Sequence, residues 1–203
     1  MLTHSDLHSL EEYSRMRDEF KQYAVTHRKN RQVAIGGHVT LHFEDRVSVQ
    51  YQIQEMLLIE RTFSQQGIQD ELDAYNPLIP TGTNLKATMT IEYSDPAVRS
   101  SMLTKLHRIE DHVYVKVEGH QPVYAIANED MDRSTDTKTA AVHFLRFELT
   151  PEMIRDIRSG TSAFTVGVDH AEYQDYTRVS TLTKEQLVKD FDTRSELIGE
   201  AHA

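Results

Sequence analysis

The sequence contains no cysteine and no tryptophan among its 203 residues. Without cysteine, the chain has no disulfide, no thiol nucleophile, no cysteine-based zinc site and no cysteine-ligated iron–sulfur cluster. This composition is typical of a reducing compartment. The N-terminal sequence lacks the apolar segment of a signal peptide, and no run approaches the ~18 apolar residues of a membrane span. We therefore expect a cytoplasmic protein that has no contact with the membrane.

Basic residues are scarce, with 22 Lys and Arg against 32 Asp and Glu and a formal net charge of -10. Binding of nucleic acid depends on basic side chains that neutralise phosphates, so we expect no nucleic-acid partner. The one dense basic cluster is Arg28, Lys29 and Arg31, beside His27. We interpret this cluster as the end of the first helix, where cations suit the helix dipole, in preference to a phosphate-binding patch.

The first part of the chain, residues 1–80, is predicted to be mainly helical with a short hairpin. A first helix runs to about residue 27, and strands at 32–35 and 39–43 are joined by Gly36 and Gly37. One long helix is expected over 45–66, followed by a short helix over 68–74. This second helix should end before Pro77, because the residue that precedes a proline avoids the helical region.

The second part, residues 84–195, is predicted to be rich in strands and to form one compact domain with the first. Strands are expected at 85–93, 113–117, 123–127 and 141–149, with a last strand at 163–168. Helices are expected at 96–108, 151–160 and 183–191. The fold class is therefore α+β. We expect an antiparallel or mixed sheet of about five strands with helices packed on one side, preceded by the mainly helical N-terminal region.

Eleven histidines suggest metal binding, but their spacing does not support a site. His38 and His42 fall about 13 Å apart along one strand, too far to share an ion. The Glu-x-x-His sequence of di-iron bundles is absent. The acidic loop at 128–136 resembles a calcium loop in its alternation, yet Arg133 stands where glycine is required. No metal and no cofactor are predicted.

Three groups of polar residues are candidates for ligand binding. The loop at 133–139 could hold an anion through charge-assisted hydrogen bonds from Arg133, Ser134, Thr135, Lys138 and Thr139, or it is simply solvated. His143 shares a strand face with Leu145 and Phe147. It is either a hydrogen-bonded core residue, which we favour, or a general acid–base residue.

The helix predicted over 45–66 carries polar side chains among large apolar ones, so several should be buried and need partners. They form either a structural network, which we favour, or the wall of a ligand pocket. The candidate residues on this helix and on the segments around it are Arg46, Gln50, Gln54, Glu55, Arg61, Tyr75, Asn76, Lys86 and Arg146. The phosphate-binding glycine loop, the hydrolase elbow and the dinucleotide fingerprint are all absent from the sequence.

Several segments are similar to those of an uncharacterised bacterial family, domain-of-unknown-function family 3501. These are FEDR at 43–46, YQIQEML at 51–57, ELDAYNPLIP at 71–80, LKAT at 85–88 and VHFLRFEL at 142–149. The resemblance extends over about positions 5–170. Members of the family are commonly encoded beside a rubrerythrin-like protein and an iron–sulfur protein that resembles heterodisulfide reductase subunits.

The resemblance implies a role near electron transfer or peroxide defence. Because the chain lacks cysteine and Glu-x-x-His, it implies an accessory protein that binds a rubrerythrin-like or iron–sulfur partner, without a redox centre of its own. The alternative is a small-molecule enzyme with a polar pocket built from the 46–61 helix, the 133–139 loop and His143. A third hypothesis is a purely structural protein or one that forms a homodimer.

Overall fold

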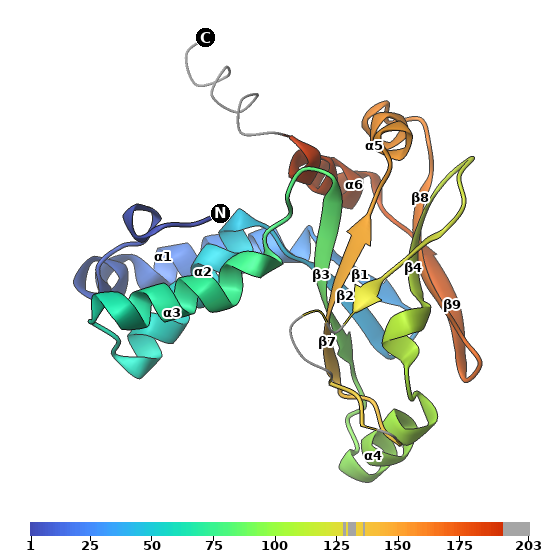
Figure 1. Ribbon diagram of the computed structural model, residues 1–203, viewed down its shortest axis with the longest axis horizontal. Coiled ribbons are helices and arrows are strands. Elements are labelled where there is room, and N and C mark those ends of the chain that lie inside the picture. The colour runs from blue at the N-terminus through green and yellow to red at the C-terminus, as the bar shows by residue number, and fades with distance from the viewer. Residues whose placement is uncertain (128, 130–132, 136, 193–203) are drawn as a thin grey trace.

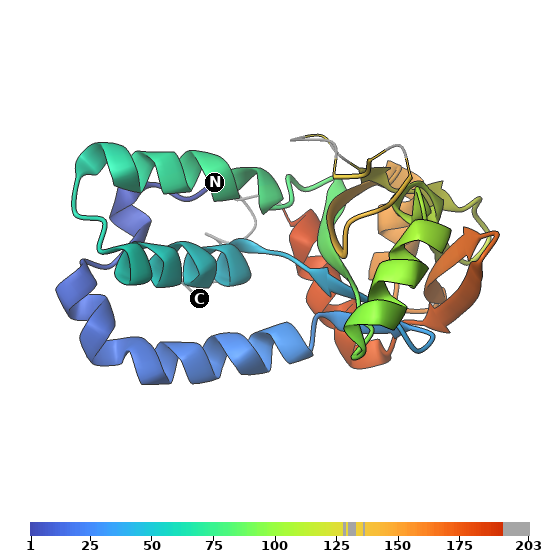
Figure 2. The ribbon, with the colours of Figure 1, turned by 90° about the horizontal axis from the view of Figure 1, so that it is seen from below.

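The structure is a computed structural model that describes residues 1–127, 129, 133–135 and 137–192. Residues 1–30 and 45–80 form a helical lobe, and the other described residues form a sheet lobe. Figure 2 shows the long helices of the helical lobe extending from one side of the sheet lobe. The chain passes between the lobes three times, at about residues 31, 44 and 82, so the lobes are joined at one junction.

The helical lobe contains three α-helices and two 3₁₀ turns. They are α1 (Leu10–Lys29), α2 (Arg46–Glu60), α3 (Gln65–Tyr75), η1 (His4–Asp6) and η2 (Asn76–Leu78). Ser9 and Asp45 begin α1 and α2 with side chains that accept backbone N–H groups, as capping residues do. A small apolar core holds the helices together, and it consists of Leu2, Val49, Ile53, Leu57 and Leu72.

The prediction of one helix over 45–66 is wrong, because the segment divides into α2 and α3. Arg61 ends α2 in the left-handed conformation, with φ of 54°. Ser64 then begins α3 by accepting a hydrogen bond from the Gly67 amide. A Cβ atom at Gly67 would lie 2.5 Å from the Thr62 side chain, so this glycine lets the connection turn back tightly. The sequence signal that we overlooked is Ser64 as a helix cap.

The sheet lobe contains two antiparallel sheets (Figure 1). The first sheet has the order β1 (Gln32–Ile35), β2 (Val39–Phe43), β3 (Asn84–Ile91), β7 (Val142–Glu148) and β6 (Ile126–Ala127). The second sheet has the order β5 (Val123–Tyr124), β4 (Val113–Val117), β8 (Phe164–His170) and β9 (Tyr173–Arg178). The α+β class and a five-stranded antiparallel sheet are thus confirmed, and a second sheet is added.

The expectation that 163–168 would be the last strand is wrong, since β9 follows β8 in a hairpin. Residues of β9 are mostly exposed on both faces, so its sequence lacks the apolar alternation that predicts a strand. The strand is held by its pairing with β8 and by side-chain hydrogen bonds to β1. Thr177 and Tyr173 donate side-chain hydrogen bonds of 2.6 and 2.5 Å to the carbonyls of Ala34 and Ile35 in β1.

The two sheets enclose one apolar core between them. On one side β5 and β6 are consecutive, and the chain passes at Ala125 from the second sheet to the first. On the other side the bonds from β9 to β1 join the sheets. Helix α4 (Pro96–Lys105) lies at one end of the sheets, and α5 (Pro151–Arg158) and α6 (Thr181–Val188) lie at the other (Figure 1). These three helices agree with the predicted ones.

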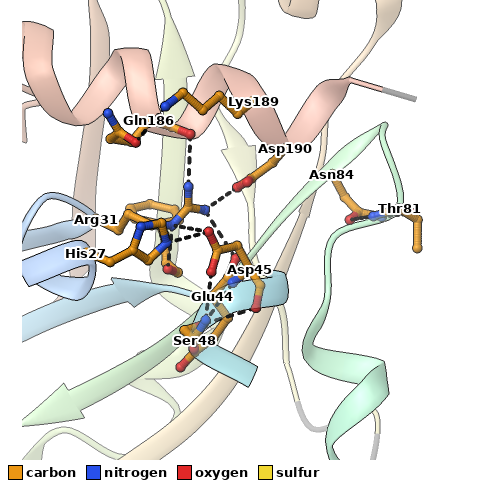
Figure 3. A network of polar contacts seen from close by, with 11 residues as sticks. His27, Arg31, Glu44, Asp45, Ser48, Thr81, Asn84, Gln186, Lys189 and Asp190 are labelled. Atoms are coloured by element: carbon orange, nitrogen blue, oxygen red, sulfur yellow. Dashed lines mark hydrogen bonds and ion pairs between the residues drawn. The ribbon is translucent and has the colours of Figure 1, made fainter. Parts of the chain in front are cut away.

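A buried arginine occupies the junction of the lobes (Figure 3). Arg31 is 1% exposed and donates to the carbonyls of Phe43, Glu44 and Gln186, at 3.1, 3.2 and 2.9 Å. It also donates to the carboxylate of Asp190. The basic cluster was interpreted as the end of the first helix, where cations suit the helix dipole. Helix α1 ends at Lys29, and Arg31, just beyond it, ties β2 and α6 together instead.

Two carboxylates accompany Arg31 at the junction. Burial raises the pKa of Asp190 to about 7, although the neighbouring guanidinium acts to lower it. Asp45 accepts a bond of 2.6 Å from His27 and one of 2.9 Å from the Ser48 amide. Burial acts to raise the pKa of Asp45. The bond from His27 and the charge of Arg31 outweigh burial and hold this pKa below its usual value. The junction is thus a connected polar network in the middle of the molecule.

We expect Arg31→Met to lower the free energy of unfolding by about 3–5 kcal/mol, because it leaves buried carbonyls and a buried carboxylate without their donor. Urea denaturation followed by circular dichroism measures this change. The matched control is Arg15→Met, at a side chain that is 73% exposed, with an expected effect below about 1 kcal/mol. Equal effects of the two changes would contradict a central role for Arg31.

Candidate functional site

A cleft separates the helical lobe from the outer face of the first sheet, and we name it the lobe cleft. It consists of three pockets of about 370, 230 and 390 Å³. The first and second pockets share Leu78 and Phe144, and the second and third share Arg28 and Thr88. Because neighbouring pockets share walls, the three pockets lie side by side along β7, β3 and β2.

The first pocket has apolar walls and two cations. Its lining consists of Asp73, Ala74, Pro77, Leu78, Lys86, Glu129, Phe144, Leu145 and Arg146. Lys86 and Arg146 lie directly opposite each other on β3 and β7. Side chains alternate along a strand, so the apolar neighbours Leu85 and Phe147 face the core while both cations face the cleft.

Each cation of the first pocket has a partner. Lys86 Nζ donates to the carbonyl oxygen of Pro77, and burial lowers the pKa of Lys86. Arg146 forms a two-pronged contact with Glu129, in which Nε and Nη2 each lie 2.8 Å from a carboxylate oxygen. Its Nη1 group donates to Glu148. The hydrogen bond to Glu129 raises the pKa of Arg146 above its usual value, against the effect of burial.

Phe144 stands between the first and second pockets, and the guanidinium carbon of Arg133 lies 4.4 Å from the centre of its ring. A cation over an aromatic face is attracted by the ring quadrupole. Arg133 therefore belongs to the edge of the lobe cleft. Tyr75 lines the second pocket, beside Glu44 and Thr88. The structure thus brings together four of the predicted candidates, namely Tyr75, Lys86, Arg133 and Arg146.

Several residues of the lobe cleft were not predicted from the sequence, including Arg28, Glu44, Thr88 and Phe144. Glu44 is 5% exposed and accepts hydrogen bonds of 2.6 Å from Ser48 and 2.7 Å from Thr88. One signal in the sequence could have indicated the cleft. If the strand at 84–91 is paired with the strand at 142–148, then Lys86, Thr88 and Arg146 lie on one face of the sheet.

The candidates on α2 lie elsewhere, because they bind the N-terminal segment and α1. Arg46 donates to the Met1 carbonyl at 2.7 Å and to Asp6, and Gln50 donates to the Asp6 carbonyl at 2.6 Å. Gln54 accepts from the amide of His8 at 2.6 Å. Glu55 accepts two bonds from Arg17 and one from Tyr13, at 2.7 to 2.9 Å.

Asn76 belongs to the same N-terminal attachment, since it exchanges two hydrogen bonds with the backbone of Leu2, at 2.7 and 2.9 Å. Arg61 is exposed and ends α2. These contacts hold the N-terminal segment against α2 and η2. They form a structural network, as we favoured for this helix from the sequence.

His143 is fully buried beside a buried carboxylate. Its Nε2 lies 2.8 Å from Thr139 Oγ1, and this hydroxyl donates to Glu110 at 2.9 Å. Ser134 also donates to Glu110. Among the described residues, His143 Nδ1 is the buried side-chain atom without a hydrogen-bond partner. Burial lowers the pKa of His143. This environment is that of a core histidine.

The rest of the 133–139 loop is held by its own contacts. Thr135 Oγ1 lies 3.2 Å from the carbonyl of Lys138, and Lys138 Nζ lies 3.4 Å from Ser100 Oγ. Asn128, Asp130, Asp132 and Asp136, at alternate positions of the predicted acidic loop, lie outside the described residues. Within the part of the chain that is described, no group of three or more metal-ligating side chains is placed to hold an ion.

No helix in the described ranges is both long enough and apolar enough to cross a membrane. Residues 1–191 match the model of a family described as a protein of unknown function, DUF3501. The chain belongs to the DUF3501 family. The family resemblance of the sequence is thereby confirmed.

The fold of this DUF3501 protein is similar to a crystal structure of a novel protein of unknown function from Burkholderia pseudomallei. The TM-score is 0.89 and the sequence identity is 45%, over 94% of this chain and 99% of that chain. No curated protein matches the chain.

We expect His143→Gln to change how the stability of this DUF3501 protein depends on pH. The pKa of the buried histidine is lower in the folded chain than its unfolded value of about 6.5, so the native chain loses stability as the pH falls below about 6.5. Glutamine keeps an N–H donor near Thr139 but does not titrate. Urea denaturation at about pH 7.5 and pH 5 should therefore show a smaller loss for the variant. Parallel losses would contradict a buried neutral His143.

Proposed function

We propose that this protein is a non-catalytic binding protein, which holds a small organic ligand in the lobe cleft and acts as an accessory component of a redox or peroxide-defence system. The observation that carries the proposal is the first pocket, with its volume of about 370 Å³ between apolar walls. Pockets for small molecules have volumes of roughly 300–1,000 Å³, mainly apolar walls and a few polar groups that orient the ligand.

The arrangement of the candidate residues favours binding over catalysis. The enzyme hypothesis requires the 46–61 helix, the 133–139 loop and His143 to build one pocket. Instead, Arg46 and Glu55 hold the N-terminal segment and α1, while His143 lies in a buried network with Glu110. A general acid or base must reach the proton that it transfers. A ligand in the first pocket meets Lys86 and Arg146, which are suited to orienting an anion.

The accessory part of the proposal is supported by the family resemblance and by composition. The resemblance implies a rubrerythrin-like or iron–sulfur protein as the partner. A chain without cysteine has no thiolate ligands for an iron–sulfur cluster, so the cluster would belong to that partner. The protein would then supply ligand binding next to an electron-transfer reaction that another chain carries out.

Filling the first pocket tests the ligand-binding part. Ala74 is exposed on α3 and lines the pocket, so we expect Ala74→Trp to fold normally and to exclude the ligand. Native mass spectrometry of protein purified from its own organism should show an additional small mass on the native chain that the variant lacks. Gln66→Trp, on the same helix but outside the pocket, is the control and should keep that mass. An identical mass on both tryptophan variants would place the ligand outside the lobe cleft.

Affinity purification tests the accessory part separately. The tagged chain is recovered from cells grown with and without peroxide, and bound proteins are identified by mass spectrometry. We expect enrichment of a rubrerythrin-like or iron–sulfur protein over a tagged acidic bait of the same size. If a folded and abundant bait recovers neither, the redox association is contradicted and the ligand-binding part still stands.

A further inference from the structure

We propose that the first pocket of the lobe cleft selects an organic carboxylate with an apolar body, and that Glu129 occupies the carboxylate position while the cleft is empty. This inference rests on the proposed function, in that it takes the lobe cleft to be the ligand site. It adds the chemical class of the ligand and a competing group within the chain. Four observations on this pocket support it.

The first observation is the geometry of Arg146. A guanidinium group presents parallel N–H donors that match the two oxygens of a carboxylate. Arg146 forms this contact with Glu129 through two bonds of 2.8 Å, at the wall of the pocket. The pocket therefore already holds a carboxylate, which shows where the acid group of a ligand would be placed.

The second observation is the exposure of the two partners. The side chain of Arg146 is 23% exposed, whereas that of Glu129 is 50% exposed. Because Glu129 is half exposed, water competes with Arg146 for its carboxylate, although the two-pronged geometry makes this pair stronger than an ordinary surface pair. A ligand carboxylate that also buries an apolar body can therefore displace Glu129. The released side chain returns to water.

The third observation is the set of donors around Arg146. Arg146 also donates to Glu148, so displacing Glu129 leaves one carboxylate on Arg146 and frees the two donors that Glu129 had bound. Lys86 lies directly opposite Arg146 and adds a second cation at this place. The carboxylate of a ligand can accept both freed donors, whereas a neutral ligand offers no pair of charged oxygens there.

The fourth observation is the shape of the apolar walls. Ala74, Pro77 and Leu78 from the helical lobe face Phe144 from β7. The volume of about 370 Å³ suits a body of one or two rings or a branched alkyl group. An aryl or branched alkyl carboxylate would place its acid group on Arg146 and its body against these residues.

The test compares three probes that share one ring system and differ in the polar group: 1-naphthoate, 1-naphthyl phosphate and the neutral 1-naphthamide. Their binding to the full chain is measured by isothermal titration calorimetry. We expect 1-naphthoate to bind more tightly than the other two probes. Arg146→Met and Lys86→Met should each weaken 1-naphthoate binding while leaving 1-naphthamide unchanged, so the test does not depend on one variant.

The competing role of Glu129 gives an effect in the opposite direction. Glu129→Gln removes the competing charge, so the affinity for 1-naphthoate should rise, by about tenfold if the Glu129 contact is formed about 90% of the time. Glu152→Gln, at an exposed acid on α5, is the matched control and should leave the affinity unchanged.

The carboxylate proposal is overturned if Glu129→Gln fails to tighten 1-naphthoate binding, or if the amide or the phosphate binds the native chain more tightly. Failure of the underlying proposed function gives a different result, because Ala74→Trp would then leave the binding of all three probes unchanged. Loss of binding in Ala74→Trp together with a preference for the amide would keep the cleft as a ligand site and reject the carboxylate class.

Discussion

The structure depends on the buried guanidinium of Arg31 at the point where the two lobes meet. Removing a charge from water is costly, and the cost is offset only when each donor finds an acceptor in good geometry. Arg31 meets this condition with acceptors from the end of β2, from α6 and from Asp190. These acceptors come from segments far apart in the chain. Arg31 also lies 3.6 Å from the carboxylate of Asp45 at the start of α2, so one charged group links the sheet lobe to the helical lobe.

The lobe cleft follows from this fixed junction. Arg31 binds the carbonyls of Phe43 and Glu44, where β2 leads into α2, and the carboxylate of Glu44 lines the cleft. Beyond it, the pairing of β3 with β7 sets Lys86 opposite Arg146 and Thr88 opposite Phe144. A slip of one residue in this register would turn these side chains into the core. The chemistry of the cleft thus depends on the same strand pairing that builds the core.

Turn residues and the alternation of apolar residues predicted individual strands and their buried faces. They did not predict the contacts between the two lobes. The two glycines at 36 and 37 fixed the bounds of β1 and β2, and the alternation around His143 identified its buried face correctly. The break between α2 and α3 was missed because Ser64 was not recognised as a cap, and β9 because its side chains are exposed on both faces. Lys86 and Arg146 were among the predicted candidates. Their position beside Leu78 depends on the packing of the two lobes, which the periodicity of the sequence does not predict.

The charge distribution limits the kind of anion that the cleft can hold. The three pockets are lined by Arg28, Lys29, Lys86 and Arg146 against Glu44, Asp73 and Glu129, a small positive excess in a chain of net charge -10. Charges beyond about 8–10 Å are largely screened at physiological ionic strength, so a monoanion inside the cleft responds mainly to its nearest cations. A long polyanion would extend past them and meet the acidic surface. This distribution is therefore compatible with a small carboxylate whose apolar body supplies most of the binding.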